Sequence, residues 1–187
     1  IKKNIDVLML GINVMNAYER EDKYNGFIDD YYTSIKWLVK FNQEHPRYNI
    51  RIKHHSSAGK DEIEEDIISK SGVKRIPKDD SFGNSYSCAF NSNCVITYGS
   101  TMGFEMIAHG VPSFFIDPGN RSLFLPPSEF DLFADIRVSD YNSFRDNLIS
   151  VLENDDNFSF DNTNLDDLCK YSSDVSNKIF KSLNNNE

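Results

Sequence analysis

Cys94-Val-Ile-Thr-Tyr98 is the clearest strand in the sequence, and a helical pattern follows it after only three residues, Gly99-Ser-Thr101. An unbroken run of apolar and β-branched residues closed by a glycine is typical of a strand buried on both faces of a parallel sheet. The apolar residues that come next recur at helical spacing until Gly110, which ends the helix. A buried strand that passes directly into a helix is half of a β-α-β unit.

The rest of the chain repeats this alternation of short apolar strands and helices. It predicts strands at 5–10, 50–53, 73–76, 113–116 and 136–138, and helices at 27–41, 63–68, 85–91, 141–152 and about 165–183. Helices of these lengths between strands form right-handed crossovers, which make the strands parallel. We therefore expect an α/β fold, a three-layer Rossmann-like domain with a mostly parallel sheet of about six strands. Residues 1–187 are expected to form this single domain.

The net charge excludes one class of partner. The 187 residues include 29 acidic and 20 basic side chains, for a formal net charge of −9. Proteins that bind nucleic acids present basic surfaces, so we expect no nucleic-acid partner. Most of the excess acid lies in the last third, because residues 1–127 hold 16 acidic and 15 basic side chains and residues 128–187 hold 13 and 5. The polar loops considered below all lie in the nearly neutral part.

The cysteine spacing and the hydropathy indicate which covalent, metal and membrane features to expect. Cys88, Cys94 and Cys169 lack CxxC spacing, so we expect neither a disulfide framework nor a zinc site. No apolar run approaches the roughly 18 residues that cross a bilayer, and no signal-peptide pattern is present. We expect a cytoplasmic protein with no membrane span, metal ion or other cofactor. Because the chain begins at Ile1 and enters a strand almost at once, we expect it to be a piece of a longer protein.

The loop after the strand quoted first is one candidate binding site. Open α/β sheets bind ligands beyond the carboxyl ends of their strands, where loops meet helix N-termini. Gly99 permits a tight turn, Ser100 or Thr101 caps the helix, and free backbone N–H groups there favour a phosphate. Gly103 would let a ligand approach the backbone, and Glu105 would accept hydrogen bonds from a ribose diol. The same residues also fit an ordinary capping box, which needs no ligand.

A second polar loop follows the strand at 50–53 and reads Lys53-His-His-Ser-Ser-Ala-Gly59. A histidine at a strand end can donate to a phosphate oxygen or act as an acid or base. Two adjacent histidines rarely both serve one site, so one of the pair is expected to matter. The alternative is a surface loop in which Ser57 or Asp61 caps the next helix.

A longer run resembles the donor-binding half of bacterial glycosyltransferases with the two-Rossmann-domain, type B fold: Asn93-Cys-Val-Ile-Thr-Tyr-Gly-Ser-Thr-Met-Gly-Phe-Glu-Met-Ile-Ala-His-Gly-Val-Pro112. It is most similar to enzymes of surface and capsular polysaccharide synthesis, including Kdo and sialic acid transferases. Those enzymes carry a strand, a Ser-Ser or Ser-Thr pair at a helix start, an acidic residue within the helix, and Gly-x-Pro before the next strand. The matching residues are Ser100-Thr101, Glu105 and Gly110-Val-Pro112.

The same families have a Lys-Pro-His-Pro-like element after an earlier strand. Lys53-His-His-Ser56 aligns with it and places His55 on the functional histidine, with neither proline present. The resemblance, which spans about residues 50–153, implies that His55, Ser100 and Thr101 hold the phosphates of a sugar nucleotide. It also implies that no metal ion is needed, and in such a site we expect Glu105 to hold the ribose.

The resemblance implies a glycosyltransferase that transfers a sugar from a nucleotide sugar to a glycan or glycolipid acceptor. Type B enzymes also need a second, acceptor-binding domain, which normally carries the catalytic base. Residues 1–187 would then be the donor-binding half, with the catalytic residues unknown. The enzyme would work in the cytoplasm, at the inner face of the membrane through the missing domain.

Two other functions stay open. One is a sugar-nucleotide epimerase or hydrolase of the same architecture. The other is a non-catalytic nucleotide-binding or interaction domain in which the acidic last third docks on a partner. Nucleotide binding that depends on Ser100 and Thr101 would favour the enzymes, and an additional Rossmann domain before Ile1 would favour transfer.

Overall fold

The computed structural model describes residues 3–14, 26–55, 58–77, 84–120 and 136–153. Its strands are β1 (Ile5–Leu10), β2 (Ile50–Lys53), β3 (Lys74–Arg75), β4 (Ser92–Thr97), β5 (Ser113–Ile116) and β6 (Arg137–Val138). Its helices are α2 (Phe27–Glu44), α3 (Glu62–Ile68), α4 (Asn84–Phe90), α5 (Met102–Ala108) and α6 (Tyr141–Glu153). The strands form one six-stranded sheet in the order β3-β2-β1-β4-β5-β6. All of its strand pairs are parallel, so the expected Rossmann-like α/β fold is confirmed.

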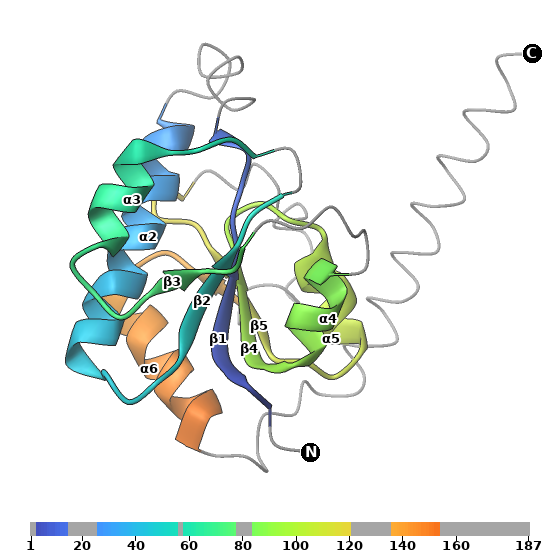
Figure 1. Cartoon of the computed structure of the whole chain (residues 1–187). Helices are drawn as coiled ribbons and strands as arrows, with labels where there is room; N and C mark the ends of the chain where they lie inside the picture. Colours follow the sequence, from blue (N-terminus) through green and yellow to red (C-terminus); the bar gives the residue numbers. More distant parts are fainter. Residues whose placement is uncertain (1–2, 15–25, 56–57, 78–83, 121–135, 154–187) are drawn as a thin grey trace, which may run out of the picture.

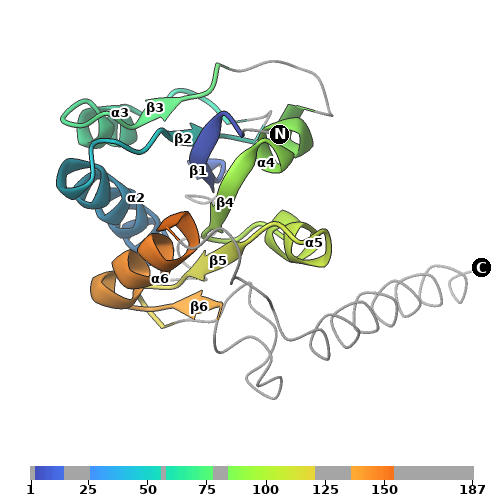
Figure 2. The same cartoon turned by 90° about the horizontal axis from the view of Figure 1, so that it is seen from below.

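Helices cover both faces of the sheet and make the expected three layers. The helices α2, α3 and α6 lie on one face, and α4 and α5 lie on the other (Figures 1 and 2). The side chains of β1 alternate between the two cores: Val7 and Met9 belong to the first, Leu8 and Leu10 to the second. Because both faces are buried, the strand reads as an uninterrupted apolar run.

The predicted elements agree closely with the observed ones. The strands β1, β2 and β5 have the predicted bounds, whereas β4 begins and ends slightly earlier than the apolar run suggested. The edge strand β3 is only two residues long, and Pro77, which has no backbone N–H to donate, follows soon after it. The last predicted helix, at 165–183, lies outside the described residues. Among the described helices, none has the length and hydrophobicity that crossing a bilayer requires.

The strand order changes direction between β1 and β4. From β1 the chain adds β2 and then β3 on one side, and it then returns to add β4, β5 and β6 on the other. The connections after β1 and β4 therefore leave the sheet in opposite directions, and in open α/β sheets such a divergence makes a crevice outside the carboxyl ends of the two strands. This is the position in the fold where ligands are expected.

Candidate functional site

Three strand ends meet at this crevice. Leu10, the last residue of β1, pairs with Lys53 of β2 on one side and with Thr97 of β4 on the other. Since neighbouring strands lie about 4.8 Å apart, the ends of β2 and β4 are separated by about 10 Å. The structure thus brings the two polar loops of the sequence analysis to opposite sides of one crevice, within the reach of a single ligand.

The loop after β4 is already hydrogen-bonded within itself. The buried Thr97 hydroxyl accepts the backbone N–H groups of Gly99 (3.2 Å) and Ser100 (2.7 Å). The Ser100 hydroxyl accepts the N–H of Met102, the first residue of α5, at 3.3 Å, whereas Thr101, the N-cap residue of that helix, makes no side-chain capping bond. The expectation of free N–H groups at this turn is therefore wrong for all three. What the loop offers a ligand is the hydroxyl groups of Ser100, which is half-buried, and Thr101, which is exposed.

Gly103 faces the sheet, not the crevice. A Cβ atom at this position would lie 2.7 Å from Cζ of Phe115 and 2.8 Å from Cγ2 of Thr97. The glycine is needed because α5 packs closely on β4 and β5. We expected Gly103 to let a ligand approach the backbone. Its role is instead this close packing.

Glu105 is turned towards the neighbouring helix α4. Its Oε2 accepts a 2.6 Å hydrogen bond from the Tyr86 hydroxyl, and this bond raises the pKa of Tyr86. The carboxylate therefore does not complete a capping box at the start of α5, and it already has a partner on the outer surface of the protein.

Lys53 is a buried cation at the crevice. Only 4% of its surface is exposed, and its ammonium group makes no hydrogen bond or ion pair with the described part of the chain. Two of the buried carboxylates differ in this respect, because Glu64 is paired with Arg75 and Asp117 with Arg137. Residues paired across parallel strands point to the same face, so the Lys53 side chain shares the α4–α5 face with Leu10 and Thr97.

His54 and His55 have different surroundings. The ring of His54 is turned to the α2–α3 face, where its Nε2 lies 2.9 Å from Oε2 of Glu64 in α3. Its side chain is 16% exposed. His55 is exposed on the loop. The resemblance had selected His55. The structure instead brings its neighbour, His54, to the crevice, where it contacts Glu64.

Glu64 is the centre of a buried polar network that the sequence analysis missed. Its side chain is fully buried, and it accepts hydrogen bonds from the Tyr31 hydroxyl (2.6 Å) and from Nε of Arg75 (3.0 Å) as well as contacting His54. Burial alone would raise the pKa of Glu64, but the hydrogen bonds from His54 and Tyr31 and the charges of His54 and Arg75 lower it overall. Burial, reinforced by the Glu64 charge, raises the pKa of Tyr31 well above its usual range.

A small pocket opens beside this network. It has a volume of about 180 Å³ and lies where β1 and β2 end and α3 begins. Its walls combine apolar, cationic and acidic side chains from Ile12, Val14, Tyr32, His54, Ala58, Gly59, Lys60, Asp61, Glu62 and Ile63. The pocket gives the crevice an extension on the α2–α3 face of the sheet.

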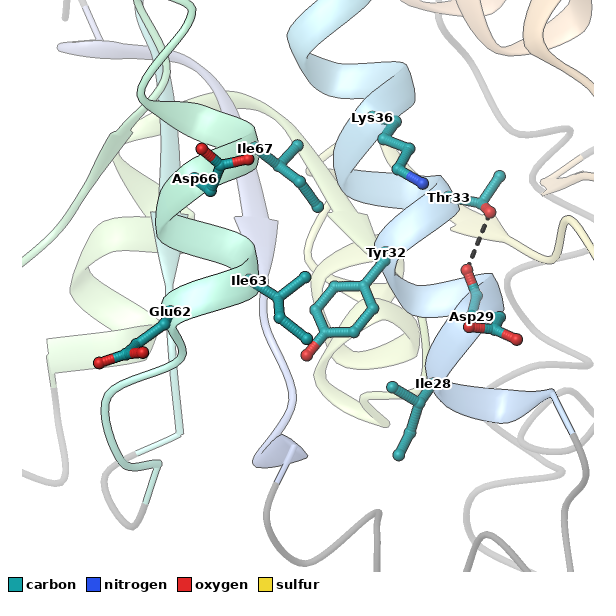
Figure 3. Close-up of a pocket in the computed structure, with 9 residues that line it drawn as sticks. All are labelled: Ile28, Asp29, Tyr32, Thr33, Lys36, Glu62, Ile63, Asp66 and Ile67. Carbon is teal, nitrogen blue, oxygen red and sulfur yellow. Dashed lines mark hydrogen bonds between the residues drawn. The ribbon is translucent and has the colours of Figure 1, made fainter.

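A larger groove of about 740 Å³ lies between the outer surfaces of α2 and α3. Figure 3 shows Tyr32 of α2 and Ile63 of α3 pointing towards each other across it. Its charged residues are Asp29, Glu62 and Asp66 against the single cation Lys36. This excess of carboxylates disfavours a phosphate, so the groove is a poorer site than the crevice for an anionic ligand.

In the described ranges no three His, Cys, Asp or Glu side chains are grouped so as to hold a metal ion. The chain matches no protein-family model, and comparisons with curated proteins and with solved structures find no significant match.

Proposed function

We propose that the chain is the sugar-nucleotide-binding domain of a metal-independent glycosyltransferase. The observation that supports this most is the buried Lys53, which has no counter-charge among the described residues at the point where the strand order changes direction. Burying an ammonium ion without a partner costs several kcal/mol. An anionic ligand in the crevice would offset that cost, and a nucleotide phosphate is such a ligand.

The two sides of the crevice complement each other for this purpose. A phosphate above the end of β1 would have Lys53 on its β2 side and the hydroxyl groups of Ser100 and Thr101 on its β4 side. An ammonium supplies charge and hydroxyl groups supply direction, and together these recognise phosphate without a metal ion. The resemblance of residues 93–112 to polysaccharide glycosyltransferases supports the same ligand.

The same groups suit the chemistry of transfer. When the bond between the sugar carbon and the phosphate oxygen breaks, its electron pair stays on the departing nucleotide. Lys53 and the two hydroxyl groups would stabilise that charge as it develops. The acceptor, a glycan or glycolipid hydroxyl, would form the new bond to the sugar carbon and lose its proton to a base on a second domain. We also propose that this enzyme works at the inner face of the membrane.

Calorimetric titration with CMP, UDP and GDP tests the proposal. We expect one of the three to bind the wild type, and we expect Lys53→Met and the double variant Ser100→Ala/Thr101→Ala each to weaken binding at least tenfold, or about 1.4 kcal/mol. The matched control is Ser69→Ala, an exposed serine at the far end of α3, which should bind as the wild type does. A folded wild type that binds none of the three would overturn the proposal. Release of free sugar from a bound sugar nucleotide without any acceptor would point to a hydrolase instead.

A further inference from the structure

Glu64 determines which ring nitrogen of neutral His54 carries the proton. An ionised carboxylate only accepts hydrogen bonds, and Nε2 of His54 lies 2.9 Å from Oε2 of Glu64. Nε2 must therefore carry the proton of the neutral ring. The other nitrogen, Nδ1, then presents a lone pair and acts as a hydrogen-bond acceptor. It has no partner within the described residues.

The ring of His54 is also held in place by packing. A Cβ atom at Gly11, just beyond β1, would lie 3.0 Å from Cδ2 and 3.1 Å from Nε2 of His54, so the backbone at Gly11 lies against the ring. Behind the ring, Arg75 fixes Glu64 and is itself held by Oε1 of Glu65 (3.1 Å) and by the backbone oxygen of Asp61 (3.3 Å). Both the tautomer and the position of the imidazole are therefore set before any ligand arrives.

The pocket beside His54 has the character of a sugar site. Its charged residues are Lys60, Asp61 and Glu62, and two of these three are carboxylates, which repel phosphate but accept hydrogen bonds from hydroxyl groups. Its apolar walls include Ile12 and Val14, which suit the C–H face of a sugar ring. A neutral group with several hydroxyls therefore fits this lining better than an anion does.

We propose that Glu64 is a positioning residue for His54 and that Nδ1 of His54 accepts a hydrogen bond from a hydroxyl group of the donor sugar. The sugar would occupy the 180 Å³ pocket on the α2–α3 face, while its phosphate lies at Lys53 and Ser100. This assignment rests on the proposed function and gives the two ends of the ligand separate contacts in the crevice.

The positioning role is tested without any ligand. Nitrogen-15 NMR of the histidine rings should show His54 of the wild type in the Nε2–H tautomer alone at pH 8. In Glu64→Gln the amide can donate as well as accept, so both tautomers should appear for His54 while the exposed His55 is unchanged. A proton on Nδ1 of His54 in the wild type would overturn the role of Glu64. The same tautomer in the wild type and in Glu64→Gln would overturn it as well.

The sugar contact is tested by comparing two probes. The affinity of the wild type, His54→Gln and His55→Gln is measured for UDP-glucose, GDP-mannose and CMP-sialic acid, and for UDP, GDP and CMP. We expect His54→Gln to weaken the sugar nucleotide that the wild type prefers about tenfold, to leave the bare nucleotide within twofold, and His55→Gln to change neither. Equal losses for both probes would put His54 on the phosphate and overturn the sugar assignment while leaving the proposed function intact. Failure of the wild type to bind any of the six would refute the proposed function and this contact with it, and the tautomer measurement would still decide the role of Glu64.

Discussion

The hydroxyl of Tyr98 donates a 2.8 Å hydrogen bond to the backbone oxygen of Phe27, and the two rings lie 5.0 Å apart. The bond joins the first residue beyond β4 to the first residue of α2 across the α2–α3 face of the sheet. It is buried, so it fixes where the loop that carries Ser100 leaves the sheet. The crevice is thus built on packed elements.

Removing that hydroxyl should cost stability. Tyr98→Phe leaves the Phe27 carbonyl without this donor, so we expect the free energy of unfolding to fall by about 1–2 kcal/mol. Urea denaturation measures it. Tyr86→Phe is the matched control, since its hydroxyl bonds to Glu105 at the surface, and it should cost less than about 0.5 kcal/mol. Equal losses in the two variants would contradict a special role for Tyr98.

Replacing Lys53 should raise the stability of the fold, although it weakens nucleotide binding. Lys53→Met keeps the length of the side chain but removes a buried charge that has no partner among the described residues, so the free energy of unfolding should rise by about 1 kcal/mol. Thermal or urea denaturation without ligand shows this change. Lys36→Met, on the surface of α2, should leave stability within about 0.5 kcal/mol. A clear loss of stability in Lys53→Met would mean that the ammonium group is satisfied in the free protein.

Two glycines should respond in opposite ways to alanine. The new methyl group in Gly103→Ala would overlap Phe115 and Thr97, so we expect a loss of about 1–3 kcal/mol from overpacking. A Cβ atom at Gly59 meets nothing within 4 Å, so Gly59→Ala should be neutral or slightly stabilising. Denaturation curves of both variants decide the point. A neutral Gly103→Ala would show that α5 can move away from the sheet.

The buried carboxylate of Glu64 should make the free energy of unfolding depend on pH. The pKa of Glu64 is lower in the folded protein than its ordinary value of 4.5, so the carboxylate stabilises the fold above that value and the contribution is lost as the pH falls through the folded pKa. The free energy of unfolding of the wild type should therefore decline on acidification below about pH 5. Glu64→Gln should flatten that decline, and Glu62→Gln, whose side chain is 86% exposed, should not. Identical slopes in all three proteins would argue against an ionised Glu64.

The fold was predictable because its cause is local. In a parallel sheet covered on both faces the central strands are apolar runs, as β1, β4 and β5 are, and helices connect β1 through β5, so the alternation along the chain specifies the architecture. The two ligand-side loops followed from the same logic, since they come directly after β2 and β4.

The details of the site were not predictable because they depend on which way each side chain points. Ile63 belongs to the apolar pattern that predicted a helix over 63–68, yet it is 50% exposed, and the inward position belongs to Glu64, one residue further on. His54 and His55 are adjacent in sequence, and only the strand's alternation of faces decides which one meets Glu64. Gly103 looked like a place for ligand approach, but its reason is Phe115, a residue of the next strand.

A nucleotide should bind where β1, β2 and β4 end. Amide NMR of the nitrogen-15-labelled chain, titrated with UDP, GDP and CMP, tests it at the level of single residues. For the nucleotide that binds, we expect the largest shifts at Gly11, His54, Ser100 and Thr101, with little change at Thr33 and Ile67 in the groove between α2 and α3. Shifts confined to that groove, or none with any of the three nucleotides, would contradict the claim.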